Sequence, residues 1–119
     1  FRYDQYDASL DLLLRTHEFS LAVRMALDRL RFPVQLSEAA RAAYLTCLSQ
    51  HTAQLLELVL SETDTVPLAF VLGLDLLDRQ ALAEGCELAR AARHTEALGL
   101  LLEYQNRRFG APRARSFDL

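Results

Sequence analysis

Three histidines are the side chains in this sequence best suited to metal binding or proton transfer, because imidazole binds zinc and titrates near neutral pH. His17, His51 and His94 each fall where one predicted helix gives way to the next. Packed helices lie about 8–10 Å apart, whereas zinc needs each imidazole nitrogen within about 2.1 Å. Histidines at three separate junctions do not meet that condition. We therefore expect structural roles for all three, and no bound metal or other cofactor.

Cys47 and His51 are the local pair that comes nearest to a nucleophile and its base. They would share one face of a helix that continued as far as His51. Cys47 also lies on an apolar stripe, which favours a buried thiol over a reactive one. Cys86 lies in another helical stretch, so we favour buried thiols in a reducing compartment, with a disulfide or redox pair as the alternative.

Carboxylates also occur in pairs of the kind that general acid–base catalysis uses. Asp75 and Asp78 form one such pair, and Glu84 and Glu87 form another, each at a spacing of i, i+3. That spacing suits a solvated helix face equally well, and the sequence has no glycine-rich phosphate-binding loop. We favour solvated faces and expect that the protein is not an enzyme.

The composition indicates what kind of scaffold positions these residues. The chain has 119 residues, enough for one domain of ordinary size, with 26 Leu and 17 Ala but no Ile. This bias favours helices over strands. A net charge of −3 and a hydrophobic content of 51% exclude a disordered chain and argue against a general nucleic-acid binder.

Apolar spacing and breaker residues divide the chain into seven predicted helices, with N-caps at Ser37, Thr65 and Asp78. Their approximate ranges are 7–16, 18–31, 38–49, 52–60, 66–77, 79–93 and 95–107. The predicted packing side of the third helix consists of Ala40, Ala43, Tyr44, Cys47 and Leu48.

The most apolar stretch, 66–77, is predicted to be a buried helix. Its 12 residues are too few for a bilayer span, which needs about 20. The first residues show no secretory signal, so we expect a cytoplasmic location. The chain begins with Phe1 instead of Met, which suggests a trimmed chain or one domain of a longer protein.

The segment 89–103 resembles the middle of an ankyrin repeat, in which two antiparallel helices meet at a Gly-His-Thr-Glu corner; here the corner is Arg93-His94-Thr95-Glu96. Arg93 stands at the usual glycine position, and no Thr-Pro-Leu-His opens the first helix. The longer stretch 19–106 is similar to divergent ankyrin-like modules at the C-termini of uncharacterised bacterial proteins. This resemblance implies an all-α fold, a short α-solenoid of stacked antiparallel helical hairpins, and no catalytic residues.

Charge separates a helical-repeat domain, residues 1–106, from an arginine-rich C-terminal tail, residues 107–119. The first segment carries a charge of −6 and the second a charge of +3. We favour a tail that packs on the last hairpin through Phe109, Phe117 and Leu119. Docking to a partner protein and contact with nucleic-acid phosphates are the alternatives.

These features predict a non-enzymatic protein–protein interaction or scaffolding module, acting alone or as part of a larger assembly. The expected partner is another protein or a second copy of the chain, with no membrane and no small-molecule substrate. The alternative is a nucleic-acid-associated regulator that docks through its tail. The predicted contact residues are Arg79, Glu84, Glu87, Arg90, Arg107, Arg108, Arg113 and Arg115.

Overall fold

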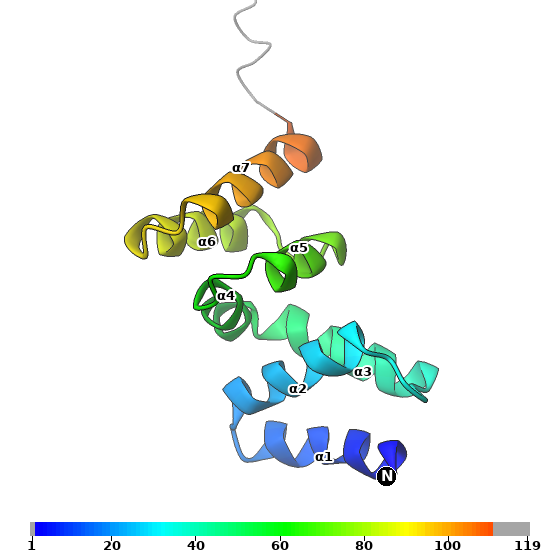
Figure 1. The fold of residues 1–119 in the computed structure, drawn as a ribbon. Helices are drawn as coiled ribbons and strands as arrows, with labels where there is room; N and C mark the ends of the chain where they lie inside the picture. Colours follow the sequence, from blue (N-terminus) through cyan, green and yellow to red (C-terminus); the bar gives the residue numbers. More distant parts are fainter. Residues whose placement is uncertain (1, 111–119) are drawn as a thin grey trace, which may run out of the picture. The chain divides into compact units, whose positions relative to one another are not determined.

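The computed structural model describes residues 2–110, and all regular structure within that range is α-helical. Residues 2–110 form seven helices, which confirms the predicted class and number of elements within this range (Figure 1). They are α1 (Tyr3–Arg15), α2 (Phe19–Arg31), α3 (Glu38–Gln50), α4 (Thr52–Leu60), α5 (Val66–Gly73), α6 (Arg79–Ala91) and α7 (Thr95–Phe109). The chain divides into two compact units, Phe1–Leu58 and Val59–Leu119, so that the boundary falls inside α4.

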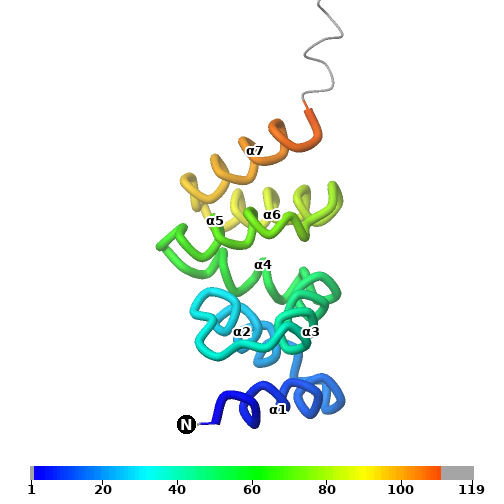
Figure 2. Tube along the Cα trace, turned by 90° about the vertical axis from the view of Figure 1, so that its right-hand side faces the viewer, coloured from blue at the N-terminus to red at the C-terminus, as the bar shows by residue number. Residues whose placement is uncertain are grey.

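The first unit is organised around α2, which packs against both α1 and α3 (Figures 1 and 2). Apolar residues recur along α2 at helical spacing, and Val23 and Ala26 have no exposed surface. From α3, Tyr44 and Leu48 are completely buried as well. This core fixes the positions of α1 and α3 on their common neighbour.

The second unit contains the antiparallel pair α6 and α7, which lie side by side in Figures 1 and 2, with α5 packed on α7. Leu82 of α6 and Leu101 of α7 are fully buried. Pro67 lies in the first turn of α5, as predicted, where its missing N–H removes no hydrogen bond from the helix.

Two of the three predicted N-caps are confirmed by their hydrogen bonds. The Ser37 hydroxyl accepts from the Ala40 N–H at 3.0 Å, and the Asp78 carboxylate accepts from the Ala81 N–H at 2.8 Å. Thr65 occupies the N-cap position of α5, but its side chain makes no capping bond. Asp64 satisfies the start of that helix instead, since its carboxylate accepts from the Val66 N–H at 3.0 Å.

Several helix ends differ from the predicted bounds. Helix α1 begins at Tyr3, before the predicted residue 7, because nothing in its first turn breaks the helix. Helix α5 ends at Gly73, and residues 74–78 form a connection to α6. Helix α7 continues to Phe109, so the first three residues of the predicted tail, 107–109, belong to its last turn.

Helices α1 and α6 end in the same motif. In α6, the His94 N–H bonds the Ala89 carbonyl at 2.9 Å and the Arg93 N–H bonds the Arg90 carbonyl at 3.0 Å, which is the Schellman pattern. Its left-handed residue is Arg93, with φ of 56°. In α1 the corresponding residue is His17, with φ of 59°. Glycine normally occupies this position because it has no Cβ to clash there.

The left-handed backbone conformation of Arg93 is expected to lower the stability of the protein, and substitution by glycine tests this. Arg93→Gly is expected to raise the free energy of unfolding by about 0.5–1 kcal/mol, because relief of the Cβ clash outweighs the added freedom of the unfolded chain. Ala83→Gly, at an exposed position inside α6, is the control and is expected to lower it by about 1 kcal/mol. Urea unfolding followed by circular dichroism measures both. Equal losses in the two variants would contradict the assigned backbone conformation.

Candidate interaction surfaces

The predicted contact residues of α6 are all exposed, but they do not form one cluster. Glu84 and Glu87 line a shallow hollow on the outer face of α6, together with Gln80, Ala83, Leu88 and Ala91. Arg90 adjoins it through an ion pair with Glu87 at 2.9 Å. Arg79 lies at the start of the helix, with its guanidinium carbon 5.0 Å from the centre of the Phe109 ring.

The C-terminal arginines are only partly described. Arg113 and Arg115 lie outside the described residues. Arg108 binds within its own unit: its Nη1 donates to the Leu77 carbonyl at 3.1 Å and to the Tyr104 hydroxyl at 2.8 Å. The Tyr104 hydroxyl in turn donates to the Asp75 carboxylate. These bonds attach the end of α7 to the connection that precedes α6, and both of them use the Arg108 Nη1.

The acidic pairs have structural partners. Asp75 accepts the Tyr104 hydroxyl, and Asp78 caps α6. Glu84 accepts from the Gln80 side chain at 3.4 Å. Capping accounts for Asp78, and i, i+4 pairing accounts for Glu84. Glu87 has its i, i+3 ion pair with Arg90, and Asp75 has its longer-range bond from Tyr104.

The histidines lie at helix junctions, as predicted. His51 is the C-cap residue of α3, and His94 is the N-cap residue of α7. The His94 Nδ1 accepts from the Ala97 N–H at 3.4 Å, and its Nε2 lies 2.8 Å from the Glu62 carbonyl oxygen. Residues 2–110 contain no group of three or more His, Cys, Asp or Glu side chains that could hold a metal ion.

An aromatic contact that was not predicted from the sequence joins two of these junctions. The Phe19 ring stacks on His17 at 5.4 Å and on His51 at 4.3 Å between ring centres. His17 precedes α2 and His51 follows α3. The Phe19 ring therefore connects the start of α2 to the end of α3. The first two histidines therefore contribute to packing.

The two cysteines are free and buried. Burial raises the pKa of the Cys47 thiol, and it also raises the pKa of the Cys86 thiol. A nucleophilic cysteine needs the opposite shift, because the thiolate is the reactive form. The burial of Cys47 and the raised pKa of its thiol therefore give no support to the Cys47–His51 dyad.

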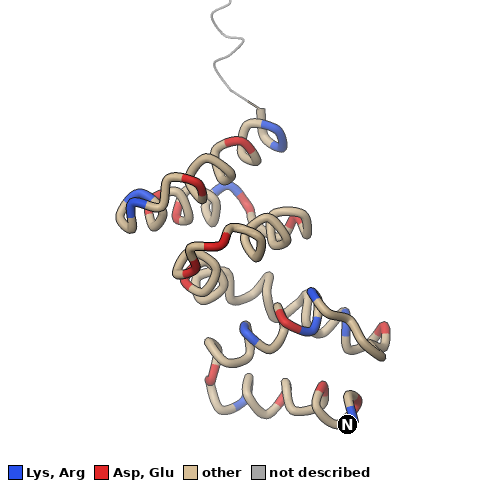
Figure 3. The backbone as a smooth tube through the Cα atoms, in the orientation of Figure 1, with Lys and Arg blue, Asp and Glu red and all other residues tan. Residues whose placement is uncertain are grey.

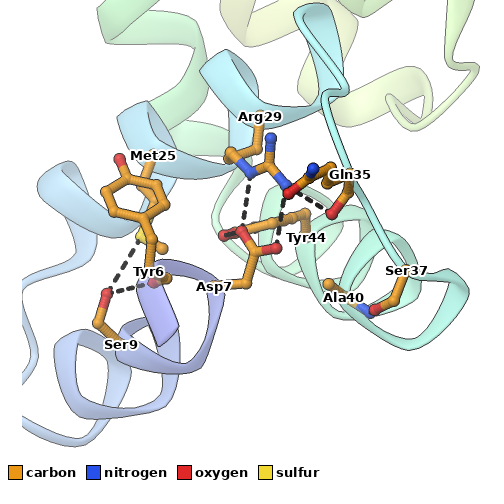
Figure 4. Close-up of polar contacts among 9 residues, drawn as sticks. All are labelled: Tyr6, Asp7, Ser9, Met25, Arg29, Gln35, Ser37, Ala40 and Tyr44. Carbon is orange, nitrogen blue, oxygen red and sulfur yellow. Dashed lines mark hydrogen bonds and ion pairs between the residues drawn. The ribbon is translucent and has the colours of Figure 1, made fainter. Parts of the chain in front are cut away.

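A buried charge cluster joins α1, α2 and α3 of the first unit (Figure 4). Asp7 of α1 receives two bonds from Arg29 of α2, at 2.8 and 3.0 Å, and a third from the Tyr44 hydroxyl of α3. The side chains of Arg29 and Asp7 are 5% and 8% exposed. The Tyr3 ring lies 4.5 Å from the Arg29 guanidinium carbon, which adds a cation–π contact.

Hydrogen bonds within the cluster and its burial shift the pKa values of Asp7 and Tyr44. The hydrogen bond from Arg29 holds the pKa of Asp7 below its usual value, and the bond from Tyr44 acts in the same direction. Burial raises the pKa of Tyr44, so the phenol stays protonated and donates. One signal for this cluster was present in the sequence: Arg29 interrupts the apolar face of α2, and a charge at such a position needs a buried partner.

A groove lies between α1 and α3, and Asp7 is one of the residues that line it. Two hollows that share Asp7 and Ala8 make up this α1–α3 groove, and the larger has a volume of about 420 Å³. From α1 the lining residues are Asp4, Asp7, Ala8, Leu10, Asp11 and Leu14. From α3 they are Ala39, Ala40, Ala42, Ala43, Thr46, Cys47 and Gln50.

The predicted packing role of Ala43 is wrong, because this residue is exposed. Tyr44, Cys47 and Leu48 of the same predicted stripe are buried. The reason is that α3 packs on α2 through that part of its surface, while the alanines turn toward the gap beside α1. Small side chains at the wall of an open groove allow another chain to approach closely.

Comparison with known proteins gives no relative: no family model, no curated protein and no solved structure matches this chain. Within residues 2–110, none of the helices combines the length and the apolar character that crossing a lipid bilayer requires.

Proposed function

We propose that this chain is a non-enzymatic protein-interaction module, built as a short α-solenoid of the divergent ankyrin-like kind. The observation that carries the proposal is the α1–α3 groove, an apolar hollow between two helices whose positions are fixed by a buried charge cluster. Grooves between packed helices are common sites for the apolar face of a partner helix.

The helix corners support the solenoid part of the proposal. Hairpin α1–α2 and hairpin α6–α7 each begin with a helix that ends in a Schellman motif with a non-glycine residue in the left-handed position. Repetition of one corner type is what a chain of stacked two-helix units requires. The resemblance at Arg93-His94-Thr95-Glu96 falls on one of these two corners.

The predicted surface on α6 stays part of the proposal as a second contact region. Its hollow contains two carboxylates and the 39% exposed Leu88, flanked by small alanines. Partly exposed leucine among charged residues is the composition of a protein contact with a polar rim. Localisation in the cytoplasm accords with the two free thiols.

Affinity capture from the native extract tests the proposed function, with light scattering to measure the mass of the free chain. The bait is the full chain, compared with Ala43→Gln in the groove and Ala83→Gln on α6, both at exposed helical positions. We expect capture of a defined protein, or a stable oligomer, that one of the two substitutions weakens. A monomer that captures only nucleic acid would reject the proposal in favour of docking through the arginine-rich segment 107–119.

A further inference from the structure

We propose that the α1–α3 groove binds an amphipathic helix of a partner protein, with basic residues along one flank of its apolar stripe. This inference rests on the proposed interaction function and names the chemical class of the partner. Three features carry it: the apolar floor, the small walls and the sign of the charges on the rim.

The shape of the groove suits a helix. Helices α1 and α3 both pack on α2, so a further helix laid between them on the open side would complete a four-helix arrangement. The floor contains Leu10 and Cys47, which are almost fully buried. The walls carry the exposed alanines Ala8, Ala42 and Ala43, whose small side chains let a partner backbone come close.

The charges of the groove select a basic partner. Every charged residue that lines it is an aspartate: Asp4, Asp7 and Asp11. Figure 3 shows acidic residues spread along α1. Asp4 and Asp11 are seven residues apart, which is about 10.5 Å along a helix, so they match two basic residues at i and i+7 on a partner helix.

Asp4 and Asp11 are also free to change partners. Their side chains are 70% and 73% exposed, and each is paired with an equally exposed arginine, Arg2 at 2.9 Å and Arg15 at 2.8 Å. Exposed pairs of this kind contribute little to stability. Asp7, in contrast, is committed to Arg29 and Tyr44 inside the protein and serves to fix the groove.

Fluorescence anisotropy with a labelled synthetic helix tests the inference on the full chain. The probe has leucines at i, i+3, i+4 and i+7 and arginines at two flanking positions seven residues apart; the control peptide carries glutamates at those two positions. We expect the arginine peptide to bind at least tenfold more tightly than the glutamate peptide, with an affinity that falls as salt concentration rises.

Two variants locate the binding site. Asp4→Asn with Asp11→Asn is expected to weaken the arginine peptide about fivefold and to leave the glutamate peptide no weaker than before. Ala43→Gln, which fills the groove from an exposed position, is expected to weaken binding at least tenfold, whereas the matched Ala83→Gln on α6 leaves it unchanged. Circular dichroism confirms that each variant is folded.

Equal binding of the two peptides, or binding that Ala43→Gln does not change, would overturn the inference. The outcome is separable from that of the proposed function. A chain that captures a protein partner from the extract, undisturbed by Ala43→Gln, retains the interaction function and loses the groove as its site. A chain that binds a second copy through the groove replaces the basic partner helix with self-association.

Discussion

Asp7→Ala is expected to lower the free energy of unfolding of the first unit by about 3–5 kcal/mol, because it leaves the Arg29 guanidinium buried without a counter-charge. The same substitution removes the acceptor of the Tyr44 hydroxyl, which is also buried. Urea unfolding followed by circular dichroism measures the loss. The charge pair is 5% and 8% exposed, so solvent does not replace the missing carboxylate in the folded state.

Asp11→Ala is the matched control, on the same helix and also paired with an arginine, but its pair is exposed. We expect a change of less than about 0.5 kcal/mol. The double variant Asp7→Leu with Arg29→Met is expected to recover most of the loss, because it removes both charges together. If Asp7→Ala lowers the free energy of unfolding as little as Asp11→Ala does, the buried charge cluster does not contribute to stability.

The Asp7 contribution also has a defined pH dependence. Its pKa is lower in the folded chain than in the unfolded chain, where an aspartate titrates near 3.9. The stabilisation is therefore complete above that unfolded-state pKa and disappears as the pH falls through the lower, folded-state value. The stability difference between the natural chain and Asp7→Asn is expected to be constant near neutral pH and to shrink below about pH 4.

Leu101→Ala is expected to lower the free energy of unfolding of the second unit by about 2–5 kcal/mol. Leu101 has no exposed surface, and its helix, α7, packs against both α6 and α5. Truncation to alanine removes buried methyl groups and leaves a cavity that rigid neighbouring helices fill only partly. Thermal or urea unfolding measures the effect.

The adjacent residue provides the control. Leu102→Ala makes the same chemical change one position along α7, at a side chain that is 38% exposed. We expect a loss of less than about 1 kcal/mol, since little buried area is removed. Losses of the same size at both leucines would mean that α7 does not present the Leu101 face to its neighbours.

Local chemistry explains why the helices were predictable. Serine and aspartate are preferred N-cap residues, so Ser37 and Asp78 indicate where a helix begins. Their side chains make the expected capping bonds. Apolar spacing marks the buried face of α2 in the same way. The start of α1 at Tyr3 was missed because no residue type marks it. The end of α7 at Phe109 comes directly before Gly110, a glycine with φ of 80°, so the residue type that marks this end was present although the predicted helix stopped at residue 107.

The charge cluster and the α1–α3 groove were not predicted, because they depend on contacts between residues far apart in the chain. Arg29 on the apolar face of α2 indicates a buried partner but does not identify it. Asp7, Arg29 and Tyr44 come from three different helices, and no local spacing links them. The exposure of Ala43 likewise depends on how α1 and α3 sit on α2. Periodicity identifies an apolar face, but it does not show which part of that face a neighbour covers.

The bond from Tyr44 to Asp7 crosses from α3 to α1, so it links the two walls of the groove in which we propose that a partner helix binds. A binding site whose two walls are already held by a hydrogen bond loses little conformational entropy when a ligand binds. Less of the binding free energy is then offset by the ordering of the site. Tyr44→Phe removes this bond and changes none of the aspartates on the rim of the groove. It therefore makes the groove less preorganised, and we expect it to weaken binding of the proposed partner helix although no contact to that helix is lost.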